Sequence, residues 1–270
     1  MRPARRRRLS SAQPREPRLN VPGQSALRLR ALLARAGAPP LAVLFCVSSA
    51  LVFFYLMDEA LEGGAERIDR AILLSLRTPG DLGTPIGPPW LLQSAIDVSA
   101  LGGFTVLWLL TLAAAGFLAL ARRWRALAIL IVAIGGASLL NAAFKSGFHR
   151  ARPDIVPHLT ESWSVSFPSG HAMISAAAYL TIAAILAQTQ RSRAARLYIL
   201  SLAALTSVLI GLSRLYLGVH WPSDVAAGWA AGSAWALAVL IVTRRAAPET
   251  EDAQAALERN GAGPRGVNRP

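Results

Sequence analysis

Three polar clusters, each placed where an apolar segment ends or begins, contain the residues best suited to chemistry. They cover residues 145–153, 168–171 and 213–224. Cations and hydrogen-bond donors can hold a phosphate, a histidine can attack phosphorus or transfer a proton, and a carboxylate can orient that histidine. This inventory predicts the cleavage of a phosphate ester. The candidate residues, in chain order, are Lys145, Arg152, Ser169, Gly170, His171, Arg214, His220 and Asp224.

In the first cluster, two cations could grip a phosphate from two sides, Arg152 through a bidentate fork and Lys145 as a point charge. They lie seven residues apart, so they would share one face if the preceding helix continued to Arg152. Pro153 disfavours helix at Arg152, and we expect the helix to end there. The alternative is that both side chains only reach for the membrane surface. Lys145 is the only lysine in the chain, which favours a specific role.

In the second cluster, Ser169 and Gly170 open an apolar segment, and a helix N-terminus binds anions through its free N–H groups. Ser169 could donate to a phosphoryl oxygen or could simply cap the helix. Gly170 allows the backbone to approach a ligand closely. His171 has no structural reason to stand at the end of a span, and we interpret it as a general acid.

In the third cluster, His220 and Asp224 have the i, i+4 spacing that brings two side chains together on a helix. Asp224 could accept a proton from one ring nitrogen and leave the other nitrogen free to attack. The alternative is a structural capping pair, but an ionisable pair at membrane depth favours a function. His149 and His158 lie in the loop beside these clusters, and we interpret them as loop residues that could contact a substrate.

Six apolar segments separate the clusters, and each is near the ~20 residues that a helix needs to cross a bilayer. The predicted fold is therefore all-α, an integral-membrane bundle of six transmembrane helices. The spans are placed at 38–57, 101–120, 126–144, 170–188, 197–217 and 223–243. We expect one membrane domain over residues 36–246, flanked by polar, disordered tails at 1–35 and 247–270.

Arginines mark one side of this bundle. Residues 1–35 hold ten arginines and one acid, Glu16, and further arginines lie at 122–125, at 191–196 and after the last span. By the positive-inside rule this side is cytoplasmic, so both termini are inside and all three clusters face outward. The predicted location is a bacterial inner membrane with the site on the periplasmic face. The basic tail could also bind anionic lipid.

The distribution of charge argues against nucleic-acid binding, and the cysteine content argues against disulfides and cysteine metal sites. The formal net charge is +13, but it is concentrated in tails and short loops rather than on a soluble face with interleaved aromatic residues, which argues against nucleic acid. The single cysteine, Cys46, lies in an apolar run, so the chain forms no internal disulfide and offers no cysteine metal site. The expected partners are a membrane lipid phosphate and the bilayer, and the oligomeric state is left open.

The loop between the first two spans, residues 58–97, contains an amphipathic stretch. Ile68, Ile72 and Leu76 recur every four residues, whereas charged residues such as Asp69 point elsewhere. This pattern predicts a short helix that lies in the membrane interface. Such a helix could guide a lipid to the site, but we favour ordinary loop packing.

The combined pattern Lys-x6-Arg-Pro, Pro-Ser-Gly-His and Ser-Arg-x5-His-x3-Asp resembles the three-part signature of the type 2 phosphatidic acid phosphatase superfamily. All its positions are filled within about eighty residues. The resemblance implies that His220 forms a phosphohistidine, that Asp224 orients it, and that His171 protonates the leaving group and then activates water. It implies no metal and no other cofactor. The phosphate would be held by Lys145, Arg152, Ser169, Gly170 and Arg214.

The resemblance implies a phosphatase that acts on lipid phosphates or diphosphates at the outer leaflet. On family precedent we favour undecaprenyl diphosphate, with phosphatidylglycerol phosphate, phosphatidate and lipid A phosphates as alternatives. A lipid phosphotransferase remains possible on the same residues. A vanadium haloperoxidase shares the constellation, but those enzymes are soluble chains. A non-catalytic lipid-binding scaffold is disfavoured by the intact histidines and aspartate.

Overall fold

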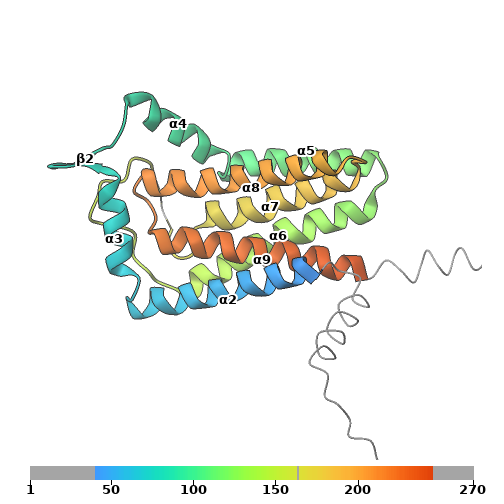
Figure 1. Cartoon of the computed structure of the whole chain (residues 1–270), viewed down its shortest axis with the longest axis horizontal. Coiled ribbons are helices and arrows are strands. Elements are labelled where there is room, and N and C mark those ends of the chain that lie inside the picture. The colour runs from blue at the N-terminus through green and yellow to red at the C-terminus, as the bar shows by residue number, and fades with distance from the viewer. Residues whose placement is uncertain (1–39, 163, 246–270) are drawn as a thin grey trace, which may run out of the picture.

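The structure, a computed structural model, describes residues 40–162 and 164–245 (Figure 1). The predicted tails 1–35 and 247–270 lie outside these residues. The described elements are α2 (Pro40–Glu62), α3 (Glu66–Ser75), β1 (Arg77–Thr78), β2 (Asp81–Pro85), α4 (Pro89–Ala100), α5 (Phe104–Leu120), α6 (Trp124–Gly147), α7 (Gly170–Gln188), α8 (Arg193–Tyr216) and α9 (Pro222–Arg245). The strands form one short antiparallel hairpin, and the rest of the architecture is helical.

The predicted all-α membrane bundle is confirmed, with one change in the second span. Five described helices, α2, α6, α7, α8 and α9, are long and apolar enough to cross a membrane. The remaining span, which is second in chain order, consists of two helices, α4 and α5, whose axes differ by 46°. The apolar segment predicted at 101–120 therefore begins earlier, in α4, and turns at Leu101–Gly103.

Gly102 lies at this bend, where a side chain would have no room. A Cβ atom at Gly102 would lie 2.4 Å from Ile210 Cγ2 and 3.4 Å from His171 Cδ2. The bend thus brings the α4–α5 junction against α8 and against the first turn of α7. Tyr179 adds a hydrogen bond from its hydroxyl to the Leu101 carbonyl, 3.0 Å away.

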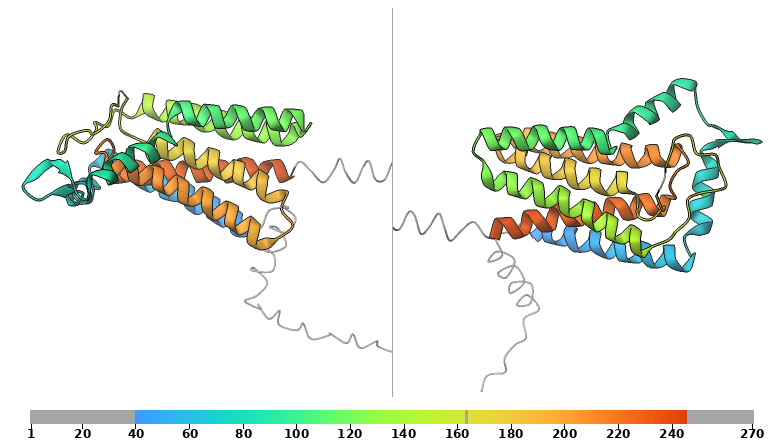
Figure 2. Two further views of the ribbon diagram at one scale, coloured as in Figure 1. Left: turned by 90° about the horizontal axis from the view of Figure 1, so that it is seen from above. Right: turned by 180° about the vertical axis from the view of Figure 1, so that it is seen from behind.

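Helix α7 lies at the centre of the bundle, between α8 and α9 (Figures 1 and 2). Of its most apolar stretch 56% is buried, against 6% for α2. Close packing needs small residues on the partner helix: a Cβ at Gly228 would lie 2.7 Å from the Ser169 carbonyl oxygen, and one at Gly232 would lie 2.2 Å from that of Met173. Helices α7 and α9 therefore pack backbone against backbone.

The outer helices present apolar side chains outward, as a lipid environment requires. On α2 the exposed side chains include Leu41, Leu44, Phe45, Leu51, Phe54 and Tyr55. In water such a surface would cost hydrophobic free energy, whereas among lipid tails it does not. Helix α2 packs along α9, and its buried Phe53 also lies against Phe144 and Phe167.

The predicted amphipathic helix is present as α3, which lies across one end of the bundle (Figure 1). Its side chains are arranged differently from the pattern that predicted it. Ile68 and Ile72 are exposed, while Leu73 and the charged Asp69 are buried. Two of the three predicted apolar positions thus face outward, the third, Leu76, packs against the core cluster that contains Leu73, and the acidic Asp69 is buried.

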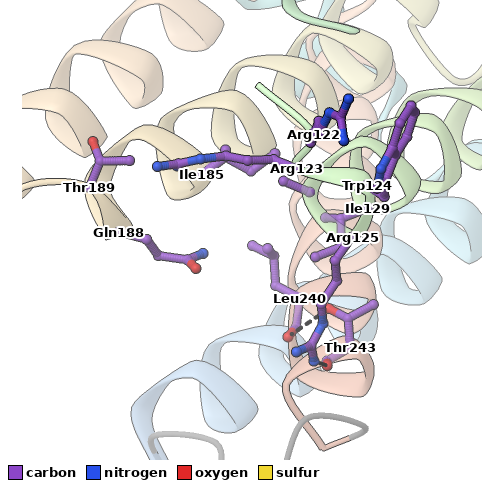
Figure 3. A pocket seen from close by; sticks show the side chains of 11 residues that line it. Arg122, Arg123, Trp124, Arg125, Ile129, Ile185, Gln188, Thr189, Leu240 and Thr243 are labelled. Carbon is purple, nitrogen blue, oxygen red and sulfur yellow. Dashed lines mark hydrogen bonds between the residues drawn. The ribbon is translucent and has the colours of Figure 1, made fainter. Parts of the chain in front are cut away.

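At the opposite end of the bundle a groove of about 670 Å³ lies between the α5–α6 turn and the last turns of α7 and α9 (Figure 3). Arg122, Arg123 and Arg125 line it, and Arg125 donates a hydrogen bond to the Thr243 carbonyl. None of the eleven lining residues belongs to the three polar clusters. Arginine-rich turns at one end fit the predicted positive-inside pattern.

Candidate active site

The three clusters meet at the end of the bundle that α3 covers. The C-terminus of α6, the N-termini of α7 and α9 and the C-terminus of α8 all lie at this end (Figure 1). The loop 148–169 crosses between them and brings Arg152 with it. The sequence-predicted residues therefore come from four helix ends, from the loop 148–169 and, for His220, from the turn between α8 and α9, and the fold of the bundle brings them together.

Asp224 stands at the centre of a buried hydrogen-bond network. Its Oδ2 atom accepts bonds from the Trp221 backbone N–H at 3.0 Å and from the Ser166 hydroxyl. The same oxygen lies 3.6 Å from His220 Nδ1. Its Oδ1 atom accepts a 2.6 Å bond from Arg150. Asp224 and His220 are both almost fully buried, so the carboxylate is fixed beside the imidazole as the i, i+4 spacing predicted.

The other ring nitrogen of His220 faces Arg152, whose NH1 lies 3.3 Å away. A guanidinium group only donates hydrogen bonds. Nε2 is therefore the acceptor, and the ring proton is on Nδ1, toward Asp224. Burial lowers the pKa of His220 to about 4, against the opposing effect of Asp224. The imidazole is thus neutral at neutral pH, with a lone pair on Nε2.

Lys145 and Arg152 converge on one residue, Ser164. Lys145 Nζ lies 2.8 Å from Ser164 Oγ and 2.8 Å from the Val165 carbonyl oxygen. Arg152 Nε donates to the Ser164 carbonyl at 2.7 Å. The helix that carries Lys145 ends at Gly147, earlier than the predicted end at Arg152. The two cations meet because the loop turns back, not because they share a helical face.

Ser169 and Arg214 hold donor atoms that are unpaired within the described residues. The Ser169 hydroxyl is buried and makes no cap bond to α7, although it precedes the first residue, Gly170. Arg214 donates from NH1 to Ser99 Oγ at 2.8 Å, while its buried Nε has no partner among the described residues. Buried donors are normally satisfied. Two unsatisfied donors at the end of the bundle where Lys145 and Arg152 also lie fit an anion such as phosphate.

His171 occupies the first turn of α7, one residue after Gly170, and packs against the α4–α5 bend at Gly102. A Cβ at Gly170 would lie 3.0 Å from Asn141 Oδ1, so the backbone there is held close to α6. The bend that positions His171 was not predicted. The two loop histidines do not join the site: His149 is exposed, and His158 contacts the Pro153 carbonyl through Nε2 at 2.7 Å.

Six residues of the site were missed by sequence reasoning. Arg150 had a possible signal, because it is a third cation within the first cluster. Asp69 was seen only as part of the polar face of a surface helix. The serines carry no signal, since serine is common at turns and caps. The six are Asp69, Ser99, Arg150, Ser164, Ser166 and Ser223.

Comparison with known proteins identifies relatives of this chain. A model of the PAP2 superfamily matches residues 126–247. Phosphatidylglycerophosphatase B of Bacillus subtilis (strain 168) is 34% identical over 193 residues, which cover 68% of this chain and 88% of that protein. An undecaprenyl-diphosphatase of Sulfolobus acidocaldarius is 40% identical over 68 residues, covering 25% of this chain and 29% of that protein.

A solved structure is also similar to this chain. It is the crystal structure of a transmembrane PAP2 type phosphatidylglycerolphosphate phosphatase from Bacillus subtilis. The match has a TM-score of 0.61 and 30% sequence identity, and it covers 72% of this chain and 94% of that one. Both the sequence match and the structural match therefore extend over most of a related membrane protein, beyond the three clusters.

Proposed function

Because this chain belongs to the PAP2 superfamily and its relatives are lipid phosphatases, we propose that it releases phosphate from a membrane lipid through a phosphohistidine on His220. One observation carries this proposal. The neutral His220 directs Nε2 toward Arg152 while Asp224 lies on its Nδ1 side. A nucleophile that is oriented from one side and faces a cation on the other is prepared to attack a bound phosphate.

In the first step Nε2 of His220 attacks phosphorus, and the bond from phosphorus to the lipid oxygen breaks. His171 gives its proton to that oxygen, so the lipid leaves as an alcohol, or as a phosphate when the substrate is a diphosphate. Asp224 stabilises the positive charge that develops on the ring through the Nδ1 proton. The phosphoryl oxygens are held by Lys145, Arg152, Ser169, the Gly170 N–H and Arg214, which stabilise charge in the transition state.

In the second step the neutral His171 accepts a proton from water, and the resulting hydroxide attacks phosphorus. The bond from phosphorus to Nε2 breaks, and its electron pair returns to His220. Inorganic phosphate leaves and the starting protonation is restored. A lipid phosphotransferase would use the same first step with an alcohol or phosphate acceptor in place of water.

The names of the relatives suggest the lipid. The relative that is matched over 88% of its length is a phosphatidylglycerophosphatase, so phosphatidylglycerol phosphate is the first candidate substrate. Undecaprenyl diphosphate, which family precedent favoured, is the second, supported by a match over 68 residues. Both present a terminal phosphate on an apolar chain, and the same donors could hold either.

The proposed orientation places the clusters on the periplasmic face of a bacterial inner membrane. Support comes from the basic end of the bundle: the turns at 122–125 and 191–196 lie at the end remote from the clusters, as do the two ends of the described chain (Figure 1). Positive loops stay cytoplasmic. Labelling of single cysteines at residues 82 and 193 in intact cells, in a C46A background, would test this orientation.

Phosphate release by detergent-purified protein in EDTA tests the proposed function. Phosphatidylglycerol phosphate and undecaprenyl diphosphate are supplied separately, with His220→Ala as the control. We expect release that is abolished in H220A, with one lipid clearly faster. If neither lipid is cleaved by folded protein, acceptor-dependent labelling decides whether the chain is a phosphotransferase.

A further inference from the structure

Asp69 is a buried carboxylate outside the three clusters. It lies on α3, the surface helix, yet only 2% of its surface is exposed. Its Oδ1 accepts a 2.9 Å bond from the Ser223 backbone N–H, and its Oδ2 accepts a 2.5 Å bond from the Ser223 hydroxyl. Asp69 of α3 therefore accepts hydrogen bonds from the first turn of α9. The dipole of α9 also favours a negative charge at this N-terminus.

Arg150 connects Asp69 to Asp224. Its NH2 lies 2.8 Å from Asp69 Oδ2, and its NH1 lies 2.6 Å from Asp224 Oδ1. NH1 also donates to the Ser223 hydroxyl at 2.7 Å. The guanidinium carbon lies over the Trp221 ring, 5.7 Å from its centroid. A planar guanidinium presents its donors in a fixed fork, so gripping Asp69 with one nitrogen sets the direction of the other.

The orientation of the Arg150 guanidinium matters because the two carboxylate oxygens of Asp224 contact different residues. Arg150 holds Oδ1, and Oδ2 is thereby turned toward the Nδ1 side of His220, at 3.6 Å. If Asp69 were neutral, Arg150 would lose its anchoring carboxylate while remaining close to Asp224. The carboxylate could then rotate, and the ring of His220 would lose its fixed tautomer and orientation.

We propose that Asp69 is a positioning residue for the reaction: through Arg150 it holds Asp224 in the orientation that prepares His220 for attack. The inference rests on the proposed phosphohistidine function and extends it to a helix that lies on the surface of the bundle. The alternative is that Asp69 only fastens α3 to α9. The two ideas differ in whether Asp69 acts on catalysis through Asp224.

The test compares Asp69→Asn with Glu66→Gln in purified full-length protein. Glu66 lies on the same helix, but it is exposed and pairs only with Arg70 at 3.6 Å among the described residues. We measure kcat, KM, the fraction of enzyme trapped as phosphohistidine, and the unfolding midpoint in detergent. We expect D69N to lower kcat by about 10-fold or more with KM within about twofold, and to lower the trapped phosphohistidine, as coupled buried networks do. E66Q should match the wild type.

A double-mutant comparison separates positioning from fastening. If Asp69 acts through Asp224, D69N should lower kcat in an Asp224→Asn background by less than about twofold. An equal loss of kcat in both backgrounds, or a lower unfolding midpoint with unchanged kcat, would overturn the inference. Should D69N fail to fold, Arg150→Lys replaces it. Lysine keeps the charge but cannot bond two carboxylates as a fork, so we expect the same loss of kcat, and wild-type kcat in R150K would overturn the inference.

The wild-type rate is a separate control. A wild-type protein that cleaves no lipid phosphate contradicts the proposed function. A wild-type protein that is active and fully retains kcat in D69N contradicts only the role of Asp69.

Discussion

Arg152 NH1 lies 3.3 Å from His220 Nε2, on the side of the imidazole opposite Asp224. This contact determines the tautomer, because a guanidinium cannot accept a hydrogen bond. We expect a phosphoryl group to bind beside this contact, where it would lie within reach of both the nucleophile and the cation. The contact joins two residues that are 68 positions apart in the sequence and belong to different clusters.

The pH dependence of His220 follows from its burial. Burial lowers its pKa to about 4, although Asp224 acts in the opposite direction. An unfolded histidine has a pKa of about 6.5, so from pH 6.5 down to 4 the unfolded chain takes up a proton that the folded protein does not. Stability should therefore fall as the pH falls through this interval.

An NMR titration checks this prediction. In protein labelled with ¹³C at histidine Cε1, with the His220 signal identified from a His220→Asn sample, we expect a midpoint near pH 4. A midpoint at about 6.5, the value of an unperturbed histidine, would contradict the effect of burial, and a midpoint above about 7 would mean that the ring is mostly charged at neutral pH and cannot attack as a neutral nucleophile.

Ser169 should matter for catalysis and not for stability, because its hydroxyl makes no cap bond in α7. A hydrogen bond to a charged group contributes about 1.5–3 kcal/mol, so Ser169→Ala should lower kcat/KM by about 10- to 100-fold with an unchanged unfolding midpoint. Thr181→Val is the matched control, since Thr181 also carries a buried hydroxyl without a partner among the described residues, on the same helix. A wild-type rate in S169A would contradict phosphate binding by this hydroxyl.

Ser164 should support substrate binding, since it contacts both Lys145 and Arg152. With Ser164→Ala the lysine loses one acceptor, and we expect KM to rise about 2- to 10-fold, the effect of about 0.5–1.5 kcal/mol for one hydrogen bond. Initial-rate kinetics measure this change. Ser146→Ala, which removes a hydroxyl that among the described residues bonds only to the Ala143 carbonyl, serves as the control and should leave KM unchanged.

The close packing of α7 and α9 predicts a contrast between two glycines. A Cβ at Gly232 would lie 2.2 Å from the Met173 carbonyl oxygen, whereas one at Gly135 would meet nothing within 4 Å. Gly232→Ala should therefore destabilise the protein by about 1–3 kcal/mol, and Gly135→Ala should leave it unchanged or stabilise it by roughly 0.5–1 kcal/mol. Unfolding midpoints in detergent measure both. Equal midpoints would contradict the close approach of the two helices.

The spans and the start of α7 could be predicted because their signals are local. Apolar length predicts a membrane helix, and Ser169 with Gly170 marks a helix start that the structure places at the same residue. The end of α6 was placed too late, at Arg152 instead of Gly147, because the proline rule gives only the last position where a helix must stop. In the structure the chain leaves α6 after Gly147, and the following loop folds back so that Ser164 contacts Lys145.

The network around Asp224 could not be predicted because it depends on residues that meet only in the folded bundle. Asp69 and Arg150 are 81 residues apart, and charged residues of a surface helix are usually solvated. Likewise, Gly102 at the α4–α5 bend lies against Ile210 and His171. Both are distant in the sequence, so no pattern within α4 or α5 predicts this contact. Motif residues can be read from spacing, whereas the residues that orient them are determined by packing.

If His220 is the nucleophile, it carries a covalent phosphoryl group during turnover, and this phosphohistidine can be trapped. Purified protein is mixed with ³²P-labelled phosphatidylglycerol phosphate in EDTA and quenched within milliseconds into alkali, which preserves phosphohistidine. We expect protein-bound label that maps to the peptide containing His220, appears before free phosphate, and is absent in His220→Ala. Rapid phosphate release without labelled protein, or label that persists in H220A, would rule out a covalent intermediate on His220.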